Sequence, residues 1–205
     1  ATTLATLISV LIGGLSGFYG GKFDLVVQRF VDGWMCFPGL IVLIIMVTLF
    51  GPGMLQIILI MGVMTGIGGS RIVRSAVISI KENVYVEASR TVGCSTVRIL
   101  GRHILPNIMA VVITLYTTRV PLMILQEAGL SFLGLGIPPP DPTWGGMLSI
   151  DGRRFMLRSP WLAFWPGFAL SMVVYSVSMF GDAIRDLLDP KLRGGVGRYS
   201  GVDSK

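Results

Sequence analysis

The stretch EASRTVGCSTVRILGRHILPN, residues 87–107, is the most polar long segment of a chain that is otherwise apolar. Its periodicity predicts two short helices separated at Gly93, because glycine adopts positive φ at no steric cost and commonly ends a helix. Ser95 or Thr96 is expected to cap the second helix. Pro106 disfavours helix at the residue before it, so the second helix is expected to end there. The segment therefore predicts a polar helix–glycine–helix between apolar segments.

The side chains of this segment predict two faces on its second helix. Val97, Leu100 and Ile104 recur at helical spacing and form an apolar stripe, whereas Arg98 and Arg102 lie four residues apart on another face. In the first helix, a glutamate and an arginine three residues apart, Glu87 and Arg90, are expected to pair at the surface. Two interpretations follow: a loop that lies on anionic lipid, or a docking element for a soluble partner. The length of about 35 residues outside the apolar segments favours docking.

The composition places the chain in a membrane. Of its 205 residues, 52% are hydrophobic and 14% are charged, and the mean hydropathy is +0.74, whereas soluble domains carry about 25% charged residues. The net charge of +6 does not indicate nucleic-acid binding, because the basic residues lie between apolar runs and not along one face. Cys36 and Cys94 give neither a disulfide framework nor a metal spacing.

Five apolar stretches are long enough to cross about 30 Å of hydrocarbon as helices. They cover residues 4–20, 31–50, 54–69, 108–125 and 161–180. The predicted fold is an all-α, polytopic transmembrane helical bundle formed by one domain over residues 1–205. A cytoplasmic loop is expected at about 71–106 and an outer loop at about 136–160.

Positive charge sets the predicted orientation, since cytoplasmic loops are enriched in Lys and Arg. Basic residues follow the first, third and fifth apolar stretches, which therefore share the cytoplasmic side. The start of the chain is then outside, which predicts an N-terminally truncated sequence and six spans in the full chain. Three arginines before the fifth stretch, Arg153, Arg154 and Arg158, lie on the predicted outer side and oppose this assignment, but the basic residues of the other loops outnumber them.

Glycines at intervals of four predict close helix packing. Gly13, Gly17 and Gly21 form one such series, and Gly62 and Gly66 form another. Small residues at this spacing let helix backbones approach in lipid. The alternative is that glycine is simply frequent in membrane helices.

The polar segment resembles the EAA loop of permease subunits of binding-protein-dependent ABC importers. The resemblance is carried by Glu87-Ala88-Ser89, by Gly93 and by Ile104-Leu105-Pro106. Ser89 replaces the second alanine of the pattern, and His103 stands where isoleucine is usual. Other stretches are similar to the oligopeptide/dipeptide C-type subunits of this family: FYGGKFD (18–24), RFVDGWMCFPGL (29–40), LSFLGLGIPPPDPTWG (130–145) and GDAIRDLLDPKLRG (181–194).

The resemblance implies a type I ABC importer permease fold and a non-catalytic transport subunit in a bacterial or archaeal cytoplasmic membrane. It implies these partners: a second homologous permease subunit, two ATPase subunits that bind the ATP and magnesium, an extracytoplasmic substrate-binding protein and the lipid bilayer. No cofactor, metal or nucleic acid is expected on this chain, and it has no phosphate-binding loop. The candidate ATPase-coupling residues are Glu87, Ala88, Ser89, Gly93, Ser95, Thr96, Arg98, Arg102 and Pro106.

Arg119 is the candidate for contact with cargo. It lies inside the fourth apolar stretch, where an unpaired arginine costs about 2.5–3.5 kcal/mol on insertion scales. It is expected to line the translocation path and attract a peptide carboxylate, or to pair with an acidic group of the sister subunit. Gln126 and Glu127 lie two turns further toward the outer mouth, and Glu127 is also interpreted as a structural residue at the helix end.

Three functions compete. The first is the importer subunit, with di- or oligopeptides as cargo and nickel chelates or another small solute as the alternative. The second is an ion-coupled secondary transporter, which needs ionisable groups in several spans and internal repeats. The third is an intramembrane enzyme, which needs paired acids, a nucleophile with a base, or metal ligands at depth. The sequence shows none of the features required by the second and third, apart from Arg119.

Overall fold

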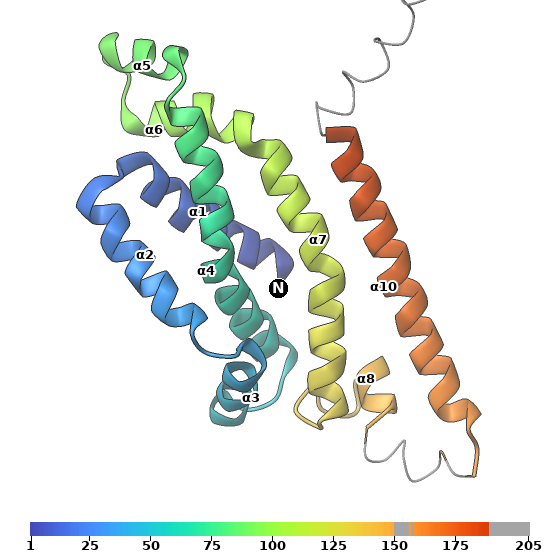
Figure 1. Cartoon of the computed structure of the whole chain (residues 1–205). Helices are drawn as coiled ribbons and strands as arrows, with labels where there is room; N and C mark the ends of the chain where they lie inside the picture. The colour runs from blue at the N-terminus through green and yellow to red at the C-terminus, as the bar shows by residue number, and fades with distance from the viewer. Residues whose placement is uncertain (150–155, 157, 189–205) are drawn as a thin grey trace, which may run out of the picture.

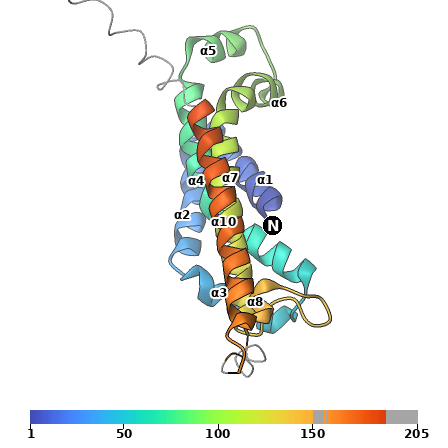
Figure 2. The same cartoon turned by 90° about the vertical axis from the view of Figure 1, so that its right-hand side faces the viewer.

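The computed structural model describes residues 1–149, 156 and 158–188, and these residues form a bundle of helices (Figure 1). In chain order the elements are α1 (Thr2–Tyr19), α2 (Gly21–Met35), α3 (Gly39–Phe50), α4 (Met54–Lys81), α5 (Val84–Thr91), α6 (Thr96–Ile99), the π-helical turn η1 (Leu100–Ile104), α7 (Leu105–Phe132), α8 (Trp144–Met147) and α10 (Trp161–Leu188). Figures 1 and 2 show α5 and α6 at one end of the bundle and α3 and α8 at the other. The predicted all-α bundle is confirmed.

The number of helices that could span a membrane agrees only in part with the five spans expected from the sequence. Among the described residues, four helices are long and apolar enough to cross a bilayer, with α6, η1 and α7 counted as one, and a fifth is added if α2 and α3 form one bent span. These two helices meet at 84° around a break before Gly39. The predicted straight span over residues 31–50 is therefore wrong. α2 ends at Met35, and Pro38, in extended conformation, is the N-cap of α3.

The boundary of the polar segment also differs from the expectation. The chain was expected to leave the bundle near Arg71, but α4 continues as helix to Lys81. Pro106 was expected to stop a helix, yet it lies in the first turn of α7, and Leu105 before it is helical (φ −55°, ψ −46°). A wider π turn comes directly before it, and such turns accommodate a residue that cannot donate to the helical ladder. The result is one continuous helical path over residues 96–132.

Glycine packing is confirmed in the seam between α1 and α4. A Cβ on Gly13 would lie 2.9 Å from the backbone nitrogen of Arg74, and one on Gly17 would lie 2.9 Å from its carbonyl oxygen. On α4, a Cβ on Gly66 would lie 2.8 Å from the Ile8 Cβ. Gly21 does not join this series: it has positive φ at the start of α2 and faces open space. The seam is thus built from backbone contact, as expected for helices that associate in lipid.

Burial within the chain is lowest at α10. Only 6% of its most apolar 18-residue window is buried, compared with 39% for α1 and 44% for α4. In Figure 1, α10 lies beside α7 at the edge of the bundle. The apolar surface of the described helices is consistent with a hydrocarbon surrounding.

Candidate functional site

The polar segment folds into a compact unit at one end of the bundle, here called the elbow and defined as residues 84–106. Its first helix ends in a Schellman motif: the Gly93 N–H donates to the Arg90 carbonyl (2.9 Å) and the Cys94 N–H to the Ser89 carbonyl (3.1 Å). Gly93 has φ +81°, so the predicted break at this glycine is confirmed. Ser95 occupies the N-cap position of α6, but its side chain makes no capping bond.

Apolar contacts fix the elbow to the ends of the spans. Val86, Ile99 and Ile104 are buried and belong to one core cluster with Phe18 of α1 and Val77 of α4. The predicted apolar stripe is therefore wrong in one member: Val97 is 80% exposed, and Ile99 takes the inward position. The reason is the π turn between residues 100 and 104, which has more residues per turn than an α-helix. Ile99, and not Val97, therefore lies on the same side as Ile104.

The candidate coupling residues lie mostly on the outer surface of the elbow. Glu87, Ala88, Gly93, Ser95, Arg98, Arg102 and Pro106 are exposed, and Ser89 and Thr96 are half-buried. The predicted surface pair between Glu87 and Arg90 is not formed in the described structure, because the Arg90 guanidinium lies over the Phe18 ring, 5.1 Å from its centroid. The Glu87 carboxylate is left exposed on the elbow surface without an ion-pair partner in that part of the chain.

Arg119 lies in α7 and is almost fully buried, with 6% exposure. Its guanidinium donates from Nη1 to the Ser9 Oγ of α1 (3.0 Å) and from Nη2 to the Thr65 carbonyl of α4 (3.0 Å). Gly69 of α4 lies directly beneath, where a Cβ would overlap the guanidinium. Arg119 thus joins three helices, and no carboxylate pairs with it among the residues the structure describes.

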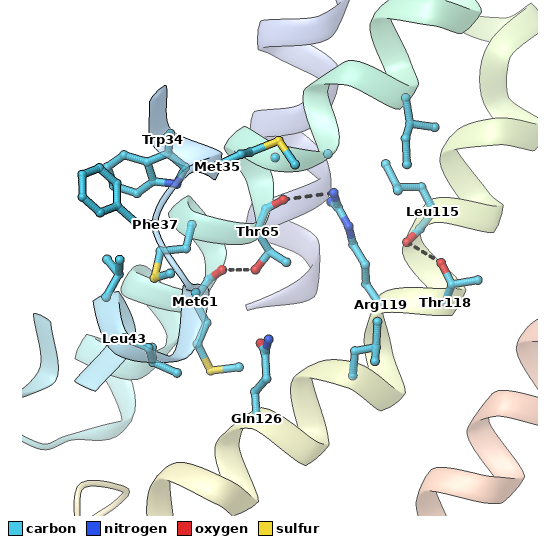
Figure 3. Close-up of a pocket in the computed structure, with 17 residues that line it drawn as sticks. Trp34, Met35, Phe37, Leu43, Met61, Thr65, Leu115, Thr118, Arg119 and Gln126 are labelled. Carbon is cyan, nitrogen blue, oxygen red and sulfur yellow. Dashed lines mark hydrogen bonds between the residues drawn. The ribbon is translucent and has the colours of Figure 1, made fainter. Parts of the chain in front are cut away.

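Arg119 also lines a cavity of about 480 Å³ between α2, α3, α4 and α7. Figure 3 shows the guanidinium reaching toward Thr65, and Met61 and Gln126 line the same cavity. The other walls are apolar and sulfur-rich: Trp34, Met35, Phe37, Leu43, Met64 and Leu122. The cavity combines one cationic group with adaptable apolar walls, an arrangement typical of sites for small organic molecules.

The structure brings together two of the three candidate path residues. Gln126 lines the Arg119 cavity. Glu127 does not: its Oε1 accepts a hydrogen bond from the Ser131 Oγ at 2.6 Å, one helical turn further along α7. The contact fits the interpretation of Glu127 as a structural residue at the helix end.

A second polar cluster was not predicted from the sequence. Asp24 of α2 accepts from the Arg74 Nε (2.6 Å) and forms a second, short contact with Arg74 Nη2. Ser16 of α1 donates to the same carboxylate and accepts from Gln28 Nε2 (3.0 Å). Bidentate arginine–carboxylate pairs are strong and geometrically specific. The cluster ties α1, α2 and α4 together below the elbow.

A sequence signal for this cluster does exist. Asp24 and Arg74 are charged residues beside apolar runs, and each needs a counter-charge if its helix is buried. Asp32 and Arg71, also on α2 and α4, form a second, more exposed pair. Two acidic residues on α2 therefore match two basic residues on α4. The expected assignment of residues 71–106 to a loop hid this correspondence.

Metal binding finds no support in the described ranges, where no group of three or more His, Cys, Asp or Glu side chains is close enough to hold an ion. His103 lies beside Tyr85, with ring centroids 6.5 Å apart.

Comparisons with known proteins point to one family. Residues 9–194 match the model of the binding-protein-dependent transport system inner membrane component. The chain is 41% identical over 194 residues to the dipeptide transport system permease protein DppC of Bacillus subtilis, covering 94% of this chain and 60% of the relative. It is 39% identical over 193 residues to the oligopeptide transport system permease protein OppC of the same organism, covering 94% and 63%. The glutathione transport system permease protein GsiD of Pectobacterium atrosepticum is 35% identical over 187 residues, with 91% and 62% covered.

The chain spans about three fifths of the length of these curated relatives. Among solved structures, it resembles a chain of the MetNI methionine ABC transporter in an inward-facing conformation. The TM-score is 0.66, the identity is 18%, and the match covers 92% of this chain and 91% of the other. This likeness concerns the fold.

Proposed function

Because the chain belongs to the family of binding-protein-dependent transport system inner membrane components, we propose that it is the permease subunit of an ATP-driven importer of di- or oligopeptides. Together with a second homologous permease subunit it encloses the translocation path in a bacterial or archaeal cytoplasmic membrane. Two ATPase subunits supply the energy and bind ATP and magnesium, while this chain carries no catalytic group. An extracytoplasmic binding protein delivers the cargo.

The elbow is the observation that supports coupling to ATPase subunits. Its inner side is buried against the ends of α1 and α4, and its outer side presents Glu87, Arg98 and Arg102. Three exposed valines, Val84, Val92 and Val97, lie among these charges. A unit that is packed against the spans on one side and open to a partner on the other passes the partner's movement to the spans. A charge-assisted bond between Glu87 and a basic partner residue contributes about 2 kcal/mol or more if the interface excludes water, and much less at its rim.

The Arg119 cavity is proposed as part of the cargo path. A buried guanidinium without a carboxylate partner in the described chain attracts a negative group from outside the chain. The C-terminal carboxylate of a peptide has this chemistry, and so does glutathione, the cargo named for one relative. An acidic side chain of the second permease subunit is the alternative partner.

The decisive experiment is reconstitution of the full-length protein with its partner subunits in proteoliposomes. Peptide uptake that requires ATP, together with copurification of the ATPase subunits in detergent, is the expected result. Replacing Gly93 with leucine is expected to weaken copurification while membrane insertion is kept. Uptake that continues without the ATPase subunits would show that the chain is not an importer subunit of this kind.

Arg119→Met tests the cargo path separately. A raised KM for peptide uptake with normal subunit assembly supports contact with cargo. Weakened assembly of the two permease subunits supports the alternative partner. Unchanged uptake and unchanged assembly would contradict both.

A further inference from the structure

A second cationic hollow lies at the other end of the spans, away from the Arg119 cavity. Its volume is about 360 Å³, and it is lined by the ends of α1 and α4 together with the elbow. In Figure 1 these segments meet at the end of the bundle that carries α5 and α6. Since Lys81 is the last residue of α4, the hollow lies where a span ends, at the level of lipid headgroups.

Two cations are held over one aromatic ring in this hollow. Lys81 Nζ lies 5.9 Å and the Arg90 Cζ lies 5.1 Å from the centroid of the Phe18 ring. Both separations fall within the range of cation–π attraction. Phe18 is itself buried, with 7% exposure. The ring therefore holds two positive groups beside the hollow, where Lys81 is half-buried and Arg90 is exposed.

Neither cation forms an ion pair within the described ranges, although the charge of Lys81 acts on the Asp24 carboxylate. The nearby Asp24 is bound in two contacts by Arg74, and Glu82, which follows Lys81, is not part of the lining. Tyr19 and Thr96 add two hydroxyl groups to the lining, and neither makes a hydrogen bond to another described residue. The hollow is thus lined by two cations and two hydroxyl-bearing residues whose side chains form no hydrogen bond or ion pair with another described residue.

The helix ends oppose this charge only in part. The C-terminal ends of α1 and α4 each contribute a partial negative charge equivalent to about half an elementary charge. The two cations outweigh this sum by about one positive charge. An oxyanion with several acceptor oxygens is the ligand that this arrangement favours.

We propose that the hollow binds the phosphodiester of an anionic phospholipid. The choice of a lipid rests on the rim: Tyr19 and Phe23 are 58% and 49% exposed, and their rings contact edge to face at 5.7 Å between centroids. Exposed aromatic rings beside basic residues are typical of the headgroup region of a bilayer. The bound lipid connects α1 and α4 to the elbow, whichever cargo the protein carries.

The test is lipid retention by the full-length protein purified with its partner subunits. The protein is placed in nanodiscs of phosphatidylcholine containing a minor fraction of phosphatidylglycerol, extracted again in detergent, and its bound phosphatidylglycerol is measured by mass spectrometry. The double variant K81Q/R90Q is expected to bind phosphatidylglycerol about thirty-fold more weakly. Each basic residue near the membrane surface contributes about 1 kcal/mol to binding, and about 1.4 kcal/mol corresponds to a tenfold change in affinity. The variant K22Q removes one exposed lysine from the start of α2 and is expected to retain the lipid.

Two further measurements keep the outcome decisive. The charge-conserving variant K81R/R90K is expected to restore retention, which separates lost charge from lost folding. Added inorganic phosphate is expected to displace little lipid, because it lacks the acyl chains. Equal retention by K81Q/R90Q and the unchanged protein would overturn the proposal. Two other results would also overturn it. One is that K81Q/R90Q loses the ATPase subunits but keeps phosphatidylglycerol, because the hollow would then receive an acidic group of a partner. The other is displacement of the bound lipid by millimolar phosphate alone.

Discussion

Arg74 and Arg119 both reach into the helix bundle, but their surroundings differ in one decisive respect. Arg74 pairs with Asp24 through two contacts near the elbow. Arg119 contacts only a hydroxyl and a carbonyl oxygen, Ser9 Oγ and Thr65 O. One charge is neutralised inside the chain, and the other is positioned but not neutralised. A buried charge is costly unless paired, so the first arginine has a structural role and the second requires a negative group from elsewhere.

The largest effect is expected on removing the counter-charge of Arg74. Asp24→Asn leaves a partly buried guanidinium unpaired and is expected to destabilise the fold by about 3 kcal/mol. The matched control is Asp32→Asn: its pair with Arg71 has side chains that are 42% and 44% exposed, against 13% and 30% for Asp24 and Arg74. A cost below about 1 kcal/mol is expected there. Thermal unfolding in detergent measures both, and equal losses would contradict the structural role of Arg74.

A smaller effect is expected on crowding Arg119. A Cβ on Gly69 would overlap the guanidinium, so Gly69→Ala is expected to displace it at a cost of about 2 kcal/mol. Gly68→Ala is the control, because its Cβ would meet only Met35 atoms at 4.0 Å. Lowered thermal stability together with altered peptide uptake is expected for the first variant only. If Gly69→Ala leaves both measurements unchanged, Arg119 is not held as described.

Removing one hydrogen bond of Arg119 tests how firmly its charge is positioned. Ser9→Ala removes the acceptor of Nη1, together with the hydroxyl that donates to the Ala5 and Gly66 carbonyls, and is expected to cost about 1.5 kcal/mol or more. Ser171→Ala provides the reference, because Ser171 is exposed and bonds only the Gly167 carbonyl in its own helix. Thermal unfolding of both variants gives the difference. No difference would mean that the guanidinium rests on Thr65 alone.

The smallest effect lies outside both arginine regions, at the elbow. Alanine at Gly93 must adopt φ near +81°, which costs about 1 kcal/mol. Gly101→Ala is the control, since Gly101 has ordinary φ and open space around it. Copurification of ATPase subunits is expected to fall slightly for Gly93→Ala and not for Gly101→Ala. If Gly93→Ala lowers thermal stability as much as Asp24→Asn does, the elbow and the α1–α2–α4 cluster form one cooperative unit.

Much of the helical content and the family could be predicted from the sequence, because apolar runs and the EAA motif are local signals. Gly93 and the close packing of Gly13 and Gly17 were predictable for the same reason, since each depends on the absence of a Cβ. The Arg119 prediction located a buried charge, but its contacts with Ser9 and Thr65 join segments 110 and 54 residues away. Such pairings have no local signal.

The wrong predictions have a common physical origin. The stop at Pro106 and the inward position of Val97 both assumed a regular helix, and the π turn at Leu100–Ile104 changes the phase of the helix between them. The straight span over residues 31–50 assumed that apolar residues continue one helix through Pro38. The predictions for Arg153, Arg154 and the end of the GDAIRDLLDPKLRG stretch concern residues outside the described ranges.

The π turn has a mechanical consequence. Without an interruption at Pro106, the path from Thr96 to Phe132 is a single helical rod of 37 residues, about 55 Å long at 1.5 Å per residue. Arg119 lies on this rod, about 35 Å from the tip at Thr96 by the same rise. A tilt of about 10° applied at the tip would shift the guanidinium by about 6 Å over that lever arm. This shift is sideways, across the bundle, so movement at the polar end of the helix would be felt at the Arg119 contacts with Ser9 and Thr65.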